Sequence, residues 1–583
     1  MIKEENQKIV QPVIGLINVV MDGDYQYEQE IPLGLAAIGA FLRQHGCKVV
    51  FHQCFASKGE DQFLMLTEIQ ADIYGFQLNL VNYKQTKAAV HLIKSMYPRA
   101  ITVCGGPFLV TAAEEILTNE PLFDCVVVGE GEIPMLDLAR SIVKKEYDFA
   151  SIKGLVWRNK ANKIIRNPLN KLIEDLDILP FPARDFLNDA KRDPIDNGLM
   201  ESVRIVTSRG CVANCSFCCV NFLSKAQGGK IWRGRSPKNV VDECEYLSKT
   251  FGVKLFNFAD SSFEDPGYKG KIRSSKICEE IIRREIPLSA KIYLRCDTMK
   301  SQDDMELLKL YKKAGIDVVI IGVEAGSDYE LELYNKKATL EDNYRTVNFL
   351  RNLDLFYIHI GFIMFGPNST RETLKQNIKF LQKTGFSDNI MHITSILMLI
   401  KGSKLYHVLK KEGRVIEDDF RELPKYSFLD PVVERMANNL QNIFVKYPIT
   451  KEVNSTLINI ANLVSRMSNP MNAKILDILK DDFEQFKRRN SELSIELGCL
   501  HHDYFCKTLD LIEQNCSDEE LKSSADYFFE KIYYHYQQVY NDFYTSFLMK
   551  VISSNVGLSG LIFKNFYSAM ELNNTKRFRG NYK

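Results

Sequence analysis

The chain has 583 residues, more than one hydrophobic core ordinarily organises, so we expect two to four domains. Hydrophobic residues make up 45% of it and charged residues 26%, which is typical of a globular protein. The 75 lysines and arginines balance 74 acidic residues, and this net charge of +1 gives no electrostatic reason to expect a nucleic-acid partner.

The N-terminal segment MIKEENQKIV is polar and charged, and no apolar run is long enough to cross a bilayer. We therefore expect neither a secretory signal nor a membrane span. Fourteen cysteines in such a chain indicate a reducing compartment, the cytoplasm, and metal binding rather than disulfides.

Short apolar runs alternate with amphipathic stretches in the first part of the chain. The predicted strands are 13–20, 47–54, 71–78, 100–106 and 123–132. Buried strands that alternate with helices predict an α/β fold, here a doubly wound, Rossmann-like parallel sheet over residues 1–150. Ligands of such sheets bind beyond the carboxyl ends of the strands.

The alternation stops over residues 151–200, where the proline-bearing segment LPFPARDFL (179–187) predicts an ordered linker. It resumes over residues 201–410. The predicted strands there are 203–208, 253–260, 290–296, 317–325, 357–366 and 390–398. Six such strands predict a partial (β/α)6 barrel.

Residues 411–583 show no further strand pattern and predict a mostly helical C-terminal domain. One helical face from Phe528 to Val551 is rich in aromatic residues, which we interpret as packing. Because this region follows the last barrel strand, we expect it to cover or shape the substrate pocket.

Three cysteines, Cys211, Cys215 and Cys218, follow the first barrel strand at a spacing of x3 and x2. Three thiolates on one short loop can bind three corners of a four-iron four-sulfur (4Fe-4S) cubane and leave one iron open. The alternatives are structural cysteines or a zinc site, but zinc needs a fourth ligand and none lies at zinc-finger spacing. We interpret the adjacent Cys219 as a core thiol.

This motif, within TSRGCVANCSFCCV, resembles the radical S-adenosylmethionine (SAM) superfamily. The resemblance implies that SAM chelates the open iron and is cleaved to a carbon radical. Residues implied to contact SAM lie in the last gap of the motif and at the ends of the next strands; they are Phe217, Asp260, Arg295, Gly322, Glu324 and Ser327. Each charged residue among them has a structural ion pair as its alternative.

Residues 13–140 resemble the cobalamin-binding domain that precedes many radical SAM barrels. The matching pieces are IPLGLAAIGAFL, GFQLNLVNY, CGGPF and VVVGEGE. Glycines at strand ends let the backbone approach a flat macrocycle. The implied cobalamin-binding residues are Leu78, Asn79, Val81, Tyr83, Gly105, Gly106, Pro107, Gly129, Glu130 and Gly131. No Asp-x-His-x-x-Gly motif supplies an axial histidine, and a scaffold without a corrinoid is the alternative.

Together the two resemblances imply a cobalamin-dependent radical SAM methyltransferase with a 4Fe-4S cluster, SAM and cobalamin as cofactors. It would methylate an unactivated carbon of a small-molecule or peptide natural product, using two SAM and an external electron donor such as flavodoxin or ferredoxin. The same modules also suit a non-methylating rearrangement, ring contraction or cyclisation. An inactive scaffold or binding protein is the alternative of another class.

Overall fold

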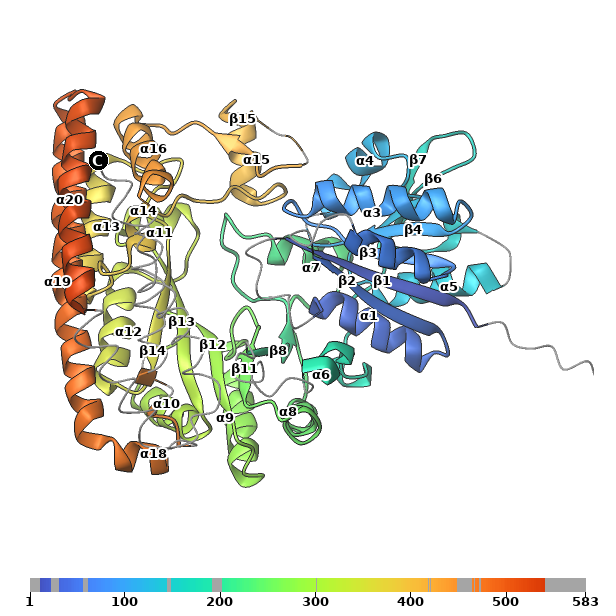
Figure 1. Ribbon diagram of the computed structural model, residues 1–583, viewed down its shortest axis with the longest axis horizontal. Helices are drawn as coiled ribbons and strands as arrows, with labels where there is room; N and C mark the ends of the chain where they lie inside the picture. Colours follow the sequence, from blue (N-terminus) through green and yellow to red (C-terminus); the bar gives the residue numbers. More distant parts are fainter. Residues whose placement is uncertain are drawn as a thin grey trace, which may run out of the picture.

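A computed structural model describes residues 11–21, 31–55, 61–107, 109–143, 148–190, 202–299, 301–417, 419, 421–447, 464–465, 467–470 and 473–539. An N-terminal α/β unit lies beside a second α/β unit, and a long helical hairpin covers the far side of the second (Figure 1). In the described part of the chain, no helix combines the length and the apolar character that a bilayer crossing requires.

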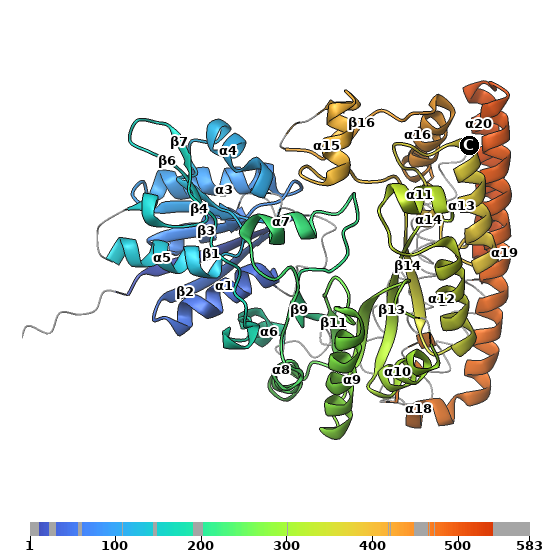
Figure 2. The same ribbon diagram turned by 180° about the vertical axis from the view of Figure 1, so that it is seen from behind.

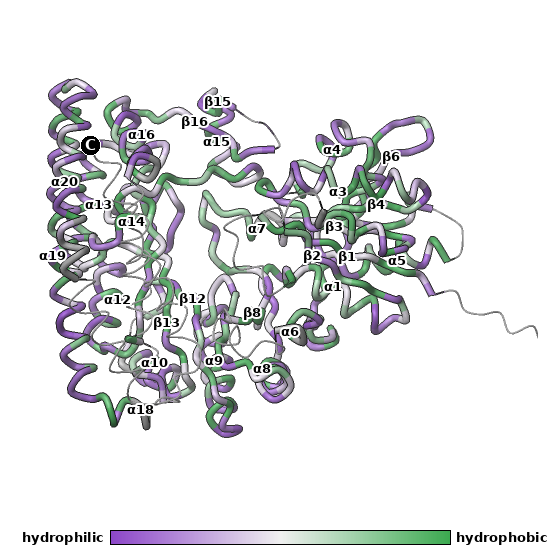
Figure 3. The backbone as a smooth tube through the Cα atoms, viewed as in Figure 1, coloured by the Kyte–Doolittle hydropathy of each residue, from purple (hydrophilic) through white to green (hydrophobic). Residues whose placement is uncertain are grey.

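The N-terminal sheet begins with five parallel strands in the order β2-β1-β3-β4-β5. They are β1 (Val13–Val20), β2 (Lys48–Phe55), β3 (Ile73–Gln77), β4 (Ile101–Gly105) and β5 (Cys125–Val127). One face packs on α1 (Leu33–Gln44) and α5 (Glu132–Val143), the other on α3 (Tyr83–Met96) and α4 (Leu109–Asn119). The predicted doubly wound sheet is confirmed, and its mainly apolar strands stand out in Figure 3.

The sheet continues beyond residue 150, into the predicted linker. Strands β6 (Leu155–Arg158) and β7 (Ile164–Arg166) add to β5 in antiparallel register. The side chain of Asn159 closes their turn by accepting from the Lys163 amide at 2.9 Å. These strands have only four and three residues, so they are too short to show the periodicity by which strands are recognised.

The second sheet has five parallel strands in the order β14-β13-β12-β11-β8. They are β8 (Val203–Ile205), β11 (Leu255–Phe258), β12 (Ser289–Arg295), β13 (Ile316–Glu324) and β14 (Tyr357–Phe362). The helices around it are α8 (Pro237–Phe251), α9 (Gly267–Arg283), α10 (Gln302–Lys313), α12 (Leu340–Leu353) and α13 (Arg371–Thr384). It forms the predicted open barrel, with its hydrophobic core between sheet and helices.

The predicted sixth strand, 390–398, is wrong for its first half. Residues Ile390–Thr394 form helix α14, whose first turn is capped by the Asn389 side chain accepting from the Met391 amide at 2.9 Å. A single parallel bridge, Phe365 to Ile396, stands where the strand was expected. A short apolar run does not by itself distinguish a strand from a buried helical turn, and here the cap decides.

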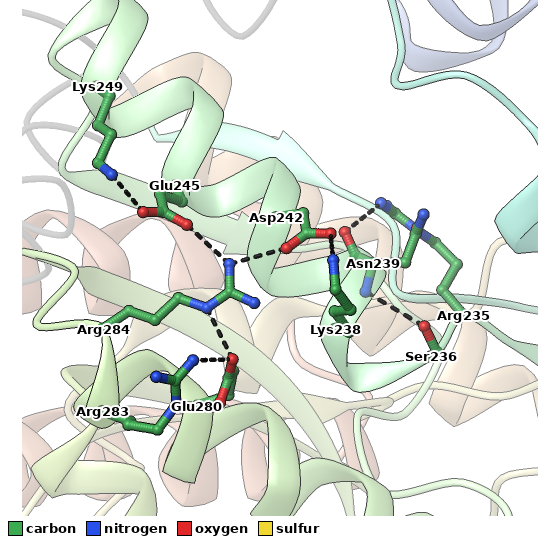
Figure 4. Close-up of polar contacts among 10 residues, drawn as sticks. All are labelled: Arg235, Ser236, Lys238, Asn239, Asp242, Glu245, Lys249, Glu280, Arg283 and Arg284. Carbon is green, nitrogen blue, oxygen red and sulfur yellow. Dashed lines mark hydrogen bonds and ion pairs between the residues drawn. The ribbon is translucent and has the colours of Figure 1, made fainter.

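An ion-pair network on the outside of the barrel joins α8 to α9 (Figure 4). The Arg284 guanidinium reaches Asp242 at 2.8 Å, Glu245 at 2.7 Å and Glu280 at 2.8 Å. One cation thus joins three carboxylates from two helices, which fixes their relative position more effectively than isolated surface pairs do.

The C-terminal helices form a hairpin of α19 (Lys480–Glu513) and α20 (Asp518–Val539). Tyr504 and Phe528 stack across it with ring centroids 4.1 Å apart. In both views the hairpin lies on the side of the barrel away from the N-terminal unit (Figures 1 and 2). It therefore packs against the barrel's outer helices and does not cover the space between the two units.

The region after residue 411 is not wholly helical. A two-stranded ribbon of β15 (Val415–Glu417) and β16 (Lys425–Tyr426) follows helix α15 (Lys404–Lys411). On the predicted aromatic face, Phe528 and Ile532 are buried, as packing requires. Phe543, Phe547 and Val551 of that face lie outside the described residues.

Candidate functional site

Hydrogen bonds hold the loop that carries the three cysteines against residues 333–335, at the end of the short helix that follows β13. The Ser216 amide donates to the Tyr334 carbonyl at 2.9 Å, and its hydroxyl donates to the Leu333 carbonyl at 2.9 Å. The Asn335 side chain donates to the Asn214 carbonyl at 2.6 Å. These bonds hold an otherwise irregular loop at the carboxyl end of the barrel strands, where sites of such folds form.

The thiols of Cys211, Cys215 and Cys218 are half-buried and free of disulfides. Burial raises the pKa of all three, to about 11 for Cys211. Each is a thiol that iron must deprotonate on binding. Among the described residues, no three His, Cys, Asp or Glu side chains converge on one metal ion. A cubane does not require that, because each thiolate binds a different iron. The loop therefore fits a cluster.

Asp260 supports the strand that leads into this loop. Its carboxylate accepts from the Thr207 hydroxyl at 2.9 Å and from the Ser208 hydroxyl at 2.7 Å, and it is 3% exposed. Both oxygens are thus used inside the protein. The geometry favours the structural alternative for Asp260 over contact with SAM.

Arg295, at the end of β12, lies near Cys211, the first of the three cysteines. Its guanidinium pairs with Asp297 and, at 3.3 Å, with Asp265. Asp265 in turn accepts from the Val212 amide at 3.2 Å, next to Cys211. The predicted SAM residue therefore belongs to an ion-pair group that also holds the loop.

Glu324 ends β13 with a φ of +69°, a conformation that L residues rarely adopt. Its carboxylate pairs with Lys336 at 3.3 Å. A Cβ on Gly322 would lie 2.7 Å from Glu324 Oε1, and one on Gly361 would lie 3.4 Å from Oε2. Two glycines thus make room for a carboxylate held over the strand ends. Strain of this kind is often stored at functional sites.

Phe217 and Ser327 were also predicted to contact SAM, but one packs against an aromatic ring and the other caps a helix. Phe217 packs edge-on against Tyr334, with ring centroids 5.6 Å apart. Ser327 is buried and caps α11 (Asp328–Leu333) by accepting from the Glu330 amide at 3.2 Å. Its hydroxyl is therefore engaged in starting a helix.

A cavity of about 660 Å³ lies between the two units. Six of the predicted cobalamin residues line it: Gly105, Gly106, Pro107, Gly129, Glu130 and Gly131. The barrel side contributes Gly210, Cys219, Val220, Ser224 and Gln227, among others. Cys219 is half-buried at this wall and is therefore not the core thiol that we predicted. The glycine-bearing strand ends thus face the segments that flank the three cysteines.

The structure does not bring the 78–83 loop into this cavity. Leu78 is fully buried, Val81 is 65% exposed, and Tyr83 hydrogen-bonds Glu120. Asn79 turns the loop by accepting from the Val81 amide at 2.9 Å. These four predicted cobalamin residues thus do not line the cavity, whereas Gln77 before them does.

Glu130 is tied to the barrel by a buried ion-pair cluster that the sequence reasoning missed. Arg209 reaches Glu130 at 2.9 Å and Glu132 at 2.6 Å, and Arg233 reaches Glu130 at 3.0 Å. Burial raises the pKa of Glu130, but the charges of Arg209 and Arg233 outweigh it and hold that pKa below its ordinary value. Removing one partner of such a cluster costs roughly 3–5 kcal/mol.

This cluster connects the two halves of the site. Arg209 stands two residues before Cys211, whereas Glu130 lies in the Gly129–Gly131 loop of the N-terminal unit. The contact therefore joins the glycine wall of the cavity to the base of the cysteine loop. The sequence shows charged residues in GEGE, next to the glycine loop, and in SRGC, next to the first cysteine. That these charges pair with one another is visible only in the folded structure.

The cavity wall also fits a flat macrocycle. A Cβ on Gly106 would lie 2.3 Å from the Leu78 carbonyl oxygen, so only glycine permits this close backbone packing at the strand end. At Gly105 the nearest atom to a Cβ would be 3.8 Å away, which leaves the space above it open. No histidine is found among the described residues that line the cavity.

Two family models match the chain: the radical SAM superfamily over residues 205–381 and the B12 binding domain over residues 26–139. The chain is 26% identical over 439 residues to an uncharacterized methyltransferase of Pyrococcus horikoshii, covering 72% of this chain and 88% of that one. It is 27% identical over 449 residues to an anaerobic magnesium-protoporphyrin IX monomethyl ester cyclase of Rubrivivax gelatinosus, covering 72% and 76%.

Among solved structures, the cobalamin-dependent S-adenosylmethionine radical enzyme OxsB with aqua-cobalamin bound matches with a TM-score of 0.67 at 19% identity. The match covers 90% of this chain and 84% of that chain. At this identity the likeness shows a common fold, which extends over both α/β units and most of the helical region.

Proposed function

We propose, from the premise that the chain belongs to the cobalamin-binding radical SAM enzymes, that it transfers a methyl group to an unactivated carbon of a small-molecule or peptide natural product. Its cofactors are a 4Fe-4S cluster, SAM and cobalamin. The observation that carries the proposal is a cavity whose walls combine the glycine strand ends of one unit with the flank of the cysteine loop of the other.

When bound, SAM on the cluster supplies a hydrogen-abstracting radical and cobalamin supplies a methyl carrier. The chain's own residues hold and separate these groups. The Ser216 and Asn335 bonds fix the cysteine loop, and Glu324 with Lys336 presents a paired charge at the strand ends where SAM is proposed to lie. The Arg209 cluster fixes the cavity wall against the loop. An external one-electron donor such as flavodoxin or ferredoxin completes the proposal.

A second function is favoured by one of the comparisons. The Rubrivivax relative is named a cyclase, and the match spans the same share of this chain as the match to the Pyrococcus methyltransferase. A cobalamin-dependent cyclisation or rearrangement uses the same modules without net methylation. The fate of the SAM methyl group separates the two.

The test supplies the anaerobic holoenzyme with SAM that carries a deuterated methyl group and with the substrate. That substrate is first identified by comparing extracts of cells with and without the gene. We expect S-adenosylhomocysteine and 5′-deoxyadenosine in equal amounts, with the deuterated methyl group in the product. A reaction without substrate corrects for uncoupled SAM cleavage. Full turnover with 5′-deoxyadenosine and no label in the product would assign the enzyme to the rearrangement class.

A further inference from the structure

Helix α7 (Val220–Gln227) begins directly after the last cluster cysteine and borders the cavity. Among the residues of α7 whose side chains the structure describes, Val220, Ser224 and Gln227 line the cavity. Their spacing of four and three residues places them on one face of the helix. The barrel thus presents a continuous helical face to the glycine wall of the N-terminal unit.

Gln227 is the last residue on that face, and its side-chain amide is buried with an unsatisfied N–H group. The residue is 9% exposed, and its Nε2 is buried without a hydrogen-bond partner among the described residues. The amide lies directly against Gly129, because a Cβ there would be 2.4 Å from Nε2. Buried polar groups are nearly always hydrogen-bonded, so an unpaired amide at a cavity wall indicates that a ligand in the cavity accepts its hydrogen bond.

We propose that Gln227 is a cobalamin-positioning residue supplied by the radical SAM unit, and that its amide donates to a carboxamide oxygen on the rim of the corrin. The proposal rests on the cobalamin binding assigned above and adds a contact from the opposite unit. A glutamine amide rotates about its last side-chain torsion, so the N–H now packed on Gly129 can turn to an acceptor in the cavity.

The chemistry of the partner agrees with this assignment. A corrin rim carries acetamide and propionamide groups, whose oxygens accept hydrogen bonds from neutral amides. The cavity wall holds a second, cationic donor, since the Nε of the Arg233 guanidinium is also buried without a partner among the described residues. The nearby carboxylates already have cationic partners: Glu130 accepts from Arg209 and Arg233, and Glu132 accepts from Arg209.

The contact has a mechanical consequence. Gln227 lies nine residues after Cys218 on a helix that starts at the cysteine loop. At 1.5 Å per residue, α7 spans roughly 12 Å from the loop to Gln227. A hydrogen bond there joins the corrin to the cluster loop through one rigid element, so it fixes the distance between the two cofactors.

The test is an anaerobic titration of the cluster-loaded full chain with hydroxocobalamin, followed by absorbance, for the wild type, Gln227→Leu and Gln227→Glu. Loss of one neutral hydrogen bond weakens binding about 3- to 10-fold. We expect that increase in Kd for both variants, because leucine has no polar group and glutamate keeps the size but replaces the N–H donor by a second oxygen. Cobinamide, which keeps the corrin amides and lacks the nucleotide tail, is expected to lose the same factor.

Gln85→Leu is the matched control. Gln85 also carries a buried amide oxygen without a partner among the described residues, but it does not line the cavity. We expect it to leave both Kd values unchanged. Unchanged corrinoid binding in Gln227→Leu would overturn the proposal, as would a loss confined to hydroxocobalamin or a loss of cluster iron alongside it. A wild type that binds neither corrinoid would overturn the cobalamin premise as well, whereas absence of methyl transfer alone would leave this test standing.

Discussion

Replacing Cys211, Cys215 and Cys218 together by alanine is expected to remove the cluster iron and to reduce 5′-deoxyadenosine formation by on the order of 10³-fold or more. The three thiols stand on one loop that backbone and side-chain bonds fasten to the turn around Tyr334. Without them the loop keeps these anchors but has no ligand for iron. Iron analysis and quantification of 5′-deoxyadenosine on anaerobically purified protein measure both effects.

Cys219→Ala is the control for that variant. It removes a thiol from the next position, which lines the cavity. We expect Cys219→Ala to keep its cluster iron and its SAM cleavage. If the triple variant retained cluster iron, the cluster would have to be placed elsewhere in the chain.

Gly105→Leu is expected to weaken cobalamin binding at least about 100-fold, equivalent to ~2.7 kcal/mol. A Cβ at Gly105 would have no atom nearer than the Val127 carbonyl oxygen at 3.8 Å, so the backbone itself tolerates a side chain. The leucine would instead project beyond the end of β4 at the cavity wall, where the macrocycle is proposed to lie. Absorbance titration of the variant with hydroxocobalamin measures the loss.

Gly105→Ala provides a graded comparison, because its single methyl group takes up little of the cavity. We expect it to bind cobalamin more weakly than the wild type and more tightly than Gly105→Leu. Thermal unfolding of the cofactor-free proteins checks that all three share one fold. Cobalamin binding by Gly105→Leu equal to that of the wild type would place the macrocycle away from the β4 edge.

The sequence predicted those features of the protein that a single short segment encodes. Buried strands such as 13–20 and 71–78 are recognisable from their mainly apolar sequence. The cysteine spacing and the Gly105–Gly106 pair are local as well, because one short loop or one strand end carries all the chemistry. Both family matches and the shared fold agree with these predictions.

The features that the sequence did not predict are contacts between segments that lie far apart along the chain. Glu130 reads like a cofactor residue in VVVGEGE, yet its partners Arg209 and Arg233 lie about 80 and 100 residues further on. Asp260 is similarly occupied by Thr207 and Ser208. Hydrophobic periodicity carries no information about which charged and polar side chains meet, so these pairings emerge only from the folded structure, within the barrel unit for Asp260 and between the two units for Glu130.

The central claim is that one chain holds a cluster and a corrinoid on facing walls of one cavity. Its most direct test is the metal content and electron paramagnetic resonance spectrum of the anaerobically reconstituted wild type. The account predicts about four irons and about one cobalt per chain, with a cob(II)alamin signal free of nitrogen coupling from histidine. A protein that holds the iron but takes up no cobalt would contradict it, as would a cob(II)alamin signal split by a histidine nitrogen.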